Sequence, residues 1–453
     1  MYSYFKSQIV TGALAEGNFL PSTRGLAQSL KVSRNTVASA YSQLCAEGYI
    51  TGKNGSGYVV LPFDVSLFKA ISGEKTGETL EPGKRKSTEK DIKFDFQYDK
   101  LNMGDFPMGA WKKSLHTALS SCEAEYLSSY NDKFGEWELR KEIMQYLNFS
   151  RGVVCRPEQI LLAAGMGASL SLICQLLRNE CDQAAVEEPC YGNTREVLKN
   201  HGMKVVPIPL EEDGMDLNIL AGSGAKLVFT TPSHQFPMGC IMGINKRLNL
   251  IKWAEENHAY IIEDDYDSEL RYNSRPIPSM QSMDSNGRII YFNTFSKAFA
   301  PGIRMSFIVL PNALMEKYTQ NFSTYNCQVA WTEQKAMQLF MQEGSWNRHM
   351  RKICTVNKKK HDTLLSALHH YMKDRVIVYG NNAGLHIVLE VKNGMDEGEL
   401  IKSAEQVGVR IYPVSVYWEN TENYRNPMVL IGYSSLTEQE IEEGICLLQS
   451  AWF

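Results

Sequence analysis

The sequence predicts an α/β protein in two parts: a small N-terminal module and a large domain built on a mostly parallel sheet. Two observations predict this fold class. The chain has 453 residues, 43% of them hydrophobic, which is enough for two or three domains with buried cores. Beyond residue 94, patterns of buried strands alternate with helical stretches. That alternation is typical of parallel strands joined by crossover helices.

Composition divides the chain into three segments. The stretch GEKTGETLEPGKRKSTEKD is polar, with glycine and mixed charges and few large apolar residues. Such a stretch cannot build a core, so it predicts a linker. We expect an N-terminal domain at 1–62, a linker at 63–93 and the large domain at 94–453.

Composition also argues against membrane, export and metal functions. No apolar run is long enough to cross a bilayer, and no basic segment leads into an apolar run at the start. The 10 cysteines form no CxxC pair, and the 9 histidines form neither HxxxH nor HExxH. We therefore expect a cytoplasmic protein with reduced thiols, no membrane partner and no metal site.

The N-terminal module begins with a pattern of three short helical segments. Ser22 and Ser33 stand where helix N-caps belong, each ahead of apolar residues at helical spacing. The helix after Ser33 presents Arg34, Asn35 and Thr36 in its first turn. Arginine can read guanine and asparagine adenine, so this segment has the features of a recognition helix.

A strand-like hairpin follows these helices. In GYITGKNGSGYVV, β-prone ends flank a glycine-rich tip, which predicts a wing on the phosphate backbone or an ordinary surface hairpin. PSTRGLAQSLKVSRNTVASAYSQLCAEGYI followed by GSGYVV resembles the winged helix-turn-helix of the GntR family. The resemblance implies that these side chains face DNA: Arg24, Arg34, Asn35, Thr36, Lys53 and Ser56. The chain starts closer to its first helical segment than is usual in that family, which leaves the packing of this helix open.

The large domain contains residues that suit a pyridoxal 5'-phosphate (PLP) site. This cofactor needs an amine for its imine, a carboxylate for its ring nitrogen, a hydroxyl near its phenolic oxygen, and cations and hydroxyls around its phosphate. In NTFSKAFAPGIR, Lys297 is predicted to form the Schiff base. In IIEDDYDSELRY, Asp264 is predicted to pair with the ring nitrogen, and Tyr266 to donate to the phenolic oxygen.

Further contacts are predicted for the phosphate and the ring. The side chains expected to hold the phosphate are Thr294, Ser296 and Arg304. Upstream, LLAAGMGASL reads as a strand, a glycine turn and a helix, so the amides of Met166 and Gly167 can point at an anion. Tyr191, in EEPCYGN, is the ring expected to stack on the cofactor.

These segments, with TTPSHQFPMG and SSYNDKFGEWELRKEI, resemble a fold type I PLP-dependent aminotransferase domain from about residue 94 to the end. That likeness implies a large, mostly parallel sheet domain and a smaller C-terminal α/β subdomain. The whole chain resembles the MocR/GabR subfamily of GntR regulators. This resemblance implies PLP as cofactor, a double-stranded DNA operator, a small amine or amino-acid effector, and a homodimer with exchanged DNA-binding domains.

Two departures from the aminotransferase pattern concern the ligand site. Phe236 stands where aminotransferases have an asparagine, so a hydrogen bond to the cofactor comes from His234 or Gln235 or is absent. Leu430 takes the place of the arginine that grips a substrate carboxylate, and Asn193 replaces an arginine of the GABA-responsive relative. Arg410 is the remaining candidate for that grip, or else a surface arginine.

The sequence thus favours a PLP-dependent DNA-binding transcription regulator that senses an amine, an amino acid or PLP through an internal aldimine. The alternative is a PLP-dependent aminotransferase with an auxiliary DNA-binding module. A scaffold with an empty pocket is a third possibility. We expect regulation and not catalysis, with a vestigial transaminase half-reaction left open.

Overall fold

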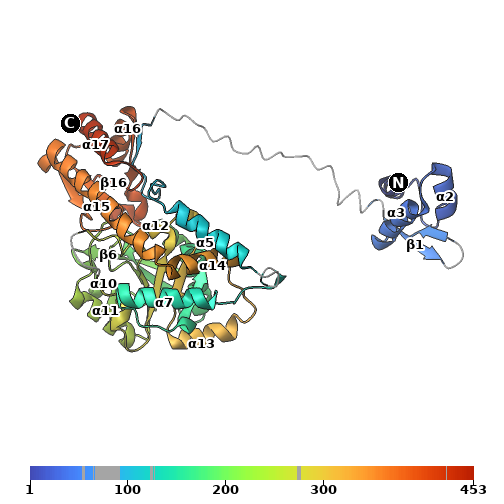
Figure 1. Cartoon of the computed structure of the whole chain (residues 1–453), viewed down its shortest axis with the longest axis horizontal. Coiled ribbons are helices and arrows are strands. Elements are labelled where there is room, and N and C mark those ends of the chain that lie inside the picture. The colour runs from blue at the N-terminus through green and yellow to red at the C-terminus, as the bar shows by residue number, and fades with distance from the viewer. Residues whose placement is uncertain are drawn as a thin grey trace. The chain divides into compact units, whose positions relative to one another are not determined.

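The computed structural model describes residues 1–53, 57–64, 66, 92–122, 126, 128–272, 277–424 and 426–453. It divides into two compact units, Met1–Thr88 and Glu89–Phe453 (Figure 1). Ser56 and most of the expected linker lie outside the described residues. Within these ranges, no helix combines the length and apolar character that a membrane span requires.

The N-terminal unit has the predicted three helices and hairpin. Its elements are α1 (Tyr2–Val10), α2 (Thr23–Leu30), α3 (Arg34–Ala46), β1 (Ile50–Lys53) and β2 (Gly57–Val60). Both N-cap predictions are confirmed. The Ser22 hydroxyl accepts from the Gly25 amide at 3.0 Å, and the Ser33 hydroxyl accepts from the Thr36 amide at 3.1 Å.

Helix α1, whose packing the sequence left open, is anchored on α3. Phe5 and Ile9 are buried in one cluster with apolar side chains of α3. The Phe5 ring meets the Tyr41 ring edge-on, at 5.6 Å between centroids. Burying two such side chains contributes roughly 1.5–3 kcal/mol each. At the other side of α1, Lys6 pairs with Glu47 at 2.8 Å, so this short helix is held by both apolar and polar contacts.

The large unit is built on an eight-stranded sheet of order β4-β11-β10-β9-β8-β5-β6-β7. In that order the strands are Ile160–Ala163, Ser306–Val309, Ile289–Thr294, Tyr260–Asp264, Leu227–Thr230, Gln183–Glu188, Lys204–Glu211 and Gly214–Met215. The run from β10 to β6 is parallel throughout, whereas β11 is antiparallel to both its neighbours and β7 to β6. The predicted mostly parallel sheet is confirmed.

Helices cover both faces of this sheet. The helices described between β3 and the C-terminal subdomain are α5 (Met108–Ser120), α7 (Trp137–Arg151), α8 (Met166–Leu177), α9 (Gly192–Asn200), α10 (Leu217–Ala221), α11 (Ile244–Glu256), α12 (Phe295–Ala298), α13 (Asn312–Asn321), α14 (Trp331–Gln342) and α15 (Ser345–Tyr371). Successive residues of β9 show the arrangement: Ile262 belongs to the core cluster that contains Leu170 of α8, and Ile261 to the cluster that contains Leu250 of α11. A strand buried on both faces has no polar alternation, which explains the continuous apolar runs in the sequence.

A smaller C-terminal subdomain carries an antiparallel sheet of order β12-β13-β16-β15. These strands are Val376–Tyr379, His386–Val391, Met428–Gly432 and Tyr412–Pro413, with helices α16 (Glu397–Gln406) and α17 (Glu438–Trp452). A separate parallel pair joins β3 (Phe94–Asp95) to β14 (Val409–Arg410). This pair holds the first described segment of the large unit against the subdomain.

Candidate cofactor site

The nine residues predicted to bind the cofactor all line one cavity of about 250 Å³. They are Met166, Gly167, Tyr191, Asp264, Tyr266, Thr294, Ser296, Lys297 and Arg304. Apart from Arg304, which lies two residues before β11, they lie at or just after the carboxyl ends of β4, β5, β9 and β10. Since these strands run in the same direction, their ends meet at one edge of the sheet, where ligands of open α/β sheets bind.

Lys297 is presented by the short helix α12, directly after β10. The Thr294 hydroxyl caps this helix by accepting from the Ser296 amide at 3.2 Å. Lys297 Nζ donates to Asp99 Oδ1 at 2.5 Å and lies 3.8 Å from the centroid of the Tyr98 ring. The amine therefore has both a carboxylate and an aromatic partner inside the cavity.

Asp264, the last residue of β9, has the environment expected of a partner for a cationic ring. It is buried, and its Oδ1 has no hydrogen-bond partner among the described residues. Burial, then the charges of Asp265, Asp267 and Glu187, raises the pKa of this carboxyl well above its ordinary value. A protonated pyridine nitrogen would satisfy the unpartnered oxygen and favour its ionised form.

The start of helix α8 provides an anion cradle. Gly165 precedes the helix with φ +92°, and a Cβ at this position would overlap the guanidinium of Arg304. The Ser306 hydroxyl accepts from the Gly165 amide at 3.1 Å and fixes the turn. The first amides of α8, on Met166 and Gly167, have no partners within the helix and are suited to a phosphate.

His234 and Gln235, predicted as ligand contacts, are buried but are not among the cavity-lining residues. Gln235 Nε2 donates to the carbonyl of Pro189 at 2.7 Å and to that of Phe236 at 2.6 Å. The Tyr266 hydroxyl donates to the His234 carbonyl at 3.0 Å. His234 is thus connected to the cavity through Tyr266, and its direct ligand contact stays a prediction.

Arg410, predicted to grip a carboxylate, lies on β14 beside β3 and does not line the cavity. Leu430, at the place of the aminotransferase arginine, is 1% exposed in the core of the subdomain. Asn193 does line the cavity. Among the described residues that line the cavity, Arg304 is the one arginine, and it lies at the anion cradle.

Five polar or aromatic residues of the described lining were not predicted: Tyr98, Asp99, Glu187, Phe229 and Thr231. Glu187 accepts from the hydroxyls of Thr230 at 2.5 Å and Thr231 at 2.8 Å, and burial raises its pKa. Glu187 and Thr231 lie in EEPCYGN and TTPSHQFPMG, so neighbouring motif residues could have indicated them. Tyr98 and Asp99 lie in none of the sequence motifs that carry the resemblance to the aminotransferase domain.

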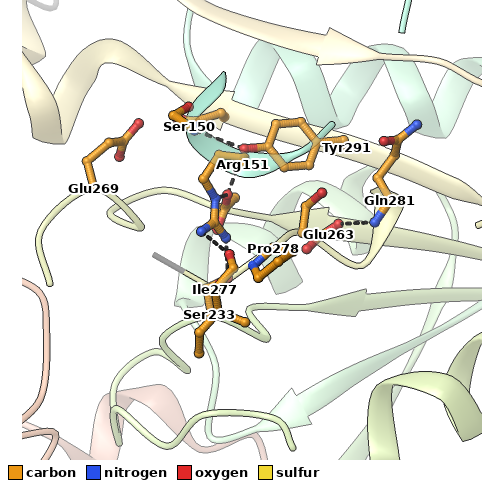
Figure 2. Close-up of polar contacts among 12 residues, drawn as sticks. Ser150, Arg151, Ser233, Glu263, Glu269, Ile277, Pro278, Gln281 and Tyr291 are labelled. Atoms are coloured by element: carbon orange, nitrogen blue, oxygen red, sulfur yellow. Dashed lines mark hydrogen bonds and ion pairs between the residues drawn. The ribbon is translucent and has the colours of Figure 1, made fainter. Parts of the chain in front are cut away.

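A buried ion pair supports the end of β9. Arg151 Nε donates to Asp265 Oδ2 at 2.7 Å, and the Tyr291 hydroxyl donates to the same oxygen at 2.6 Å. Arg151 also donates to the Ser233 hydroxyl and the Ile277 carbonyl (Figure 2). Burial opposes ionisation of Asp265, but the adjacent guanidinium holds its pKa below the ordinary value. This network fixes the residue next to Asp264 and so fixes the strand end.

In the N-terminal unit, the described residues predicted to face DNA are all exposed: Arg24, Arg34, Asn35, Thr36 and Lys53. Arg34, Asn35 and Thr36 form the first turn of α3. The Thr36 hydroxyl lies 2.8 Å from that of Ser33, so one member of this turn is already engaged by the helix cap.

The sheet topology, with an amine, a buried carboxylate and an anion cradle in one cavity, defines an aminotransferase-like domain. Residues 98–445 match the family model described as aminotransferase class I and II, and residues 1–60 match that of bacterial regulatory proteins, gntR family. The chain belongs to the MocR-type helix-turn-helix regulators of the GntR family, transcription regulators with an aminotransferase-like domain.

Curated relatives match over the full length. The uncharacterized HTH-type transcriptional regulator YdeL of Bacillus subtilis is 37% identical over 452 residues, covering 100% of this chain and 96% of the relative. The probable rhizopine catabolism regulatory protein MocR of Rhizobium meliloti is 33% identical, covering 100% and 93%. Among solved structures, kynurenine aminotransferase of Pyrococcus horikoshii has a TM-score of 0.70 at 25% identity, covering 80% of this chain and 91% of that enzyme.

Proposed function

We propose that this protein binds PLP in the Lys297 cavity and an operator through the N-terminal unit, and that a small amine or amino acid entering the cavity changes its binding to DNA. One observation carries the proposal: the unpartnered, buried Oδ1 of Asp264 belongs to the same cavity as the Lys297 amine. A carboxylate of this kind suits a cationic ring next to a nucleophilic lysine.

The bound cofactor supplies an aldehyde that condenses reversibly with primary amines. In this proposal Lys297 provides the resident amine and Asp264 keeps the ring nitrogen protonated. Tyr266 orients the phenolic oxygen, and Tyr191 stacks on the ring. The phosphate contacts are the amides of Met166 and Gly167 and the side chains of Thr294, Ser296 and Arg304.

Release of Lys297 offers a route to regulation. An effector amine that takes over the bond to the cofactor frees the Lys297 amine, which can then pair with Asp99 as it does in this structure. Asp99 lies on the chain segment that directly follows β3 in the large unit. A ligand-dependent contact of this segment would shift a conformational equilibrium only by the difference in contact energy between the two states.

The proposal includes a cytoplasmic homodimer with exchanged DNA-binding domains.

The test compares the wild-type chain with Lys297→Ala after incubation with PLP. We expect the wild-type protein to become coloured and to retain the cofactor on this lysine after borohydride reduction and digestion. The variant should lose both signals and the response of DNA binding to amines, while basal DNA binding remains. Lys317→Ala, which removes a lysine paired with Glu180 outside the cavity, should behave as wild type. A borohydride adduct absent from the Lys297 peptide of the wild type would overturn the proposal.

A second candidate is an aminotransferase with an auxiliary DNA-binding module. It is favoured by the presence of Lys297, Asp264 and Tyr266 around one cavity. Leu430 in the core and Arg410 outside the lining argue against it, because the described lining holds no second arginine for a substrate carboxylate. Sustained conversion of an amino donor and an oxoacid at ~1 per second or faster would favour the enzyme.

A further inference from the structure

Among the described carboxylates of the cavity lining, Asp99 pairs with Lys297 and has no assigned role toward the cofactor. The lining contains the carboxylates Asp99, Glu187 and Asp264. Glu187 is occupied by threonine hydroxyls, and Asp264 is assigned to the ring nitrogen. The Asp99 side chain is 56% exposed and pairs with Lys297. When the lysine amine is engaged by the cofactor, this carboxylate loses a full ammonium partner.

The described lining residues include two cations. They are Lys297, which reacts with the cofactor, and Arg304, which lies at the anion cradle. An effector carboxylate placed near Asp99 would therefore meet a like charge, and the described lining offers no further arginine to offset it. A second ammonium group on the effector would meet an opposite charge at the same place.

The segment that carries Asp99 is held in place by backbone contacts. The Gly432 amide donates to the Phe96 carbonyl at 2.9 Å, and a Cβ on Gly432 would overlap the Tyr98 backbone. The Tyr98 ring packs against Phe236 at 5.2 Å and His386 at 4.6 Å between centroids. Asp99 thus follows a fixed aromatic residue and is not part of a free tail.

The Tyr98 ring offers an aromatic face to a cation that pairs with the Asp99 carboxylate. Lys297 Nζ lies 3.8 Å from its ring centroid, within the range of a cation–π contact. The ring and the neighbouring carboxylate therefore already hold one ammonium group in this structure. A carboxylate has two oxygens, so Asp99 can accept from a released lysine and from a ligand cation together.

We propose that Tyr98 and Asp99 form a cation subsite that selects, as effector, a primary amine bearing a second cationic group, such as a diamine, over an amino acid with a free carboxylate. The inference rests on the proposed function and names its effector class. In the exchange, the cofactor carbon passes from Lys297 Nζ to the effector nitrogen, and two protons pass from the effector amine to Nζ. No oxidant or reductant is consumed.

Three probes of equal chain length test the subsite: 1,4-diaminobutane, butylamine and 4-aminobutyrate. Each is titrated into the PLP-loaded full-length protein, and the midpoint of the change in cofactor absorbance is compared. We expect the diamine to act at about fivefold lower concentration than butylamine, and 4-aminobutyrate at about fivefold higher concentration, as for partly exposed charge pairs. Operator binding should respond in the same order.

Asp99→Asn keeps the shape of the side chain and removes its charge. The three midpoints should then fall within about twofold of one another, with thermal unfolding and basal DNA binding unchanged. Asp105→Asn removes a charge outside this cavity, on the same loop segment, and should keep the wild-type order. Equal midpoints in the wild type, preference for 4-aminobutyrate, or an unchanged order in Asp99→Asn overturns the subsite and leaves the proposed function standing. A spectrum that no amine shifts overturns both.

Discussion

The two compact units carry their functional groups in opposite ways. In the N-terminal unit, Arg34 and its neighbours are exposed on one helical turn and contribute little to the core. In the large unit, Asp264 is buried at a strand end beside the Arg151–Asp265 ion pair. The difference teaches that DNA contacts can change without loss of the fold, whereas changes to the buried ion pair beside the cofactor site also test the stability of the sheet.

The largest effect should come from the buried ion pair. Arg151→Met leaves the Asp265 carboxylate buried without its guanidinium partner, since Arg151 is 1% and Asp265 0% exposed at the side chain. Breaking such a pair costs about 3–5 kcal/mol. We expect the free energy of unfolding of the large unit, measured by urea denaturation, to fall by this amount. Lys141→Met on the same helix removes an exposed partner of Glu138 and should cost less than about 1 kcal/mol.

If Arg151→Met left stability unchanged, the contrast between the units would fail, because the cofactor edge would then tolerate charge changes as an exposed helix does. A decrease in PLP retention by Arg151→Met, at temperatures where the variant is still folded, would strengthen the contrast between the two units. That result would show that the ion pair positions the end of β9 in addition to stabilising it.

Much of the fold could be predicted because its signals are local. The runs AYIIEDD and RIIYFNTFSK became β9 and β10, and their last residues carry Asp264 and Thr294. Since parallel strands end at one edge, a motif on each strand was enough to bring these side chains together. Ser22 and Ser33 were equally local, because an N-cap bonds to an amide within the same turn.

The effector side could not be predicted in the same way. Asp99 reaches the cavity because β3 pairs with β14 and residues 96–98 cross Gly432, contacts that join segments more than 300 residues apart. Arg410 was the candidate carboxylate ligand or else a surface arginine; its strand pairs with β3 and it is not among the described lining residues, so its ligand contact stays a prediction. Neither position follows from periodicity, since both depend on how the subdomain closes on the first segment.

The second prediction concerns Asp264→Asn. The substitution removes the charge that would hold the ring nitrogen protonated, and a hydrogen bond to a charged group contributes about 1.5–3 kcal/mol. We expect PLP affinity, measured by absorbance titration, to fall by about 10- to 150-fold with little loss of stability, because burial already disfavours the ionised carboxyl. Asp213→Asn, at an exposed partner of Lys246, should leave PLP affinity unchanged. Equal affinities for wild type and Asp264→Asn would remove this residue from the site.

The third prediction concerns α3, whose first turn is exposed. Arg34→Ala removes a side chain from the first turn of α3, and a base contact of this kind contributes about 1–3 kcal/mol. Operator affinity, measured by fluorescence anisotropy at fixed salt, should fall by about 5- to 150-fold while thermal unfolding is unchanged. Arg156→Ala removes the same charge from the surface of the large unit and should not affect DNA affinity. Equal losses in both variants would indicate a contribution of total charge alone.

The smallest effect separates folding from recognition within one helical turn. Ser33 is exposed, yet its hydroxyl caps α3 by accepting from the Thr36 amide. Replacing such a cap by alanine costs about 1 kcal/mol, so Ser33→Ala should lower the local free energy of opening of α3, measured by hydrogen exchange of peptides from residues 23–46. Ser42→Ala, at an exposed position inside the same helix, should leave exchange unchanged or slightly slower, because alanine has the higher helix propensity. If both variants exchanged alike, the cap would contribute nothing, and the N-terminal unit would depend on its apolar core alone.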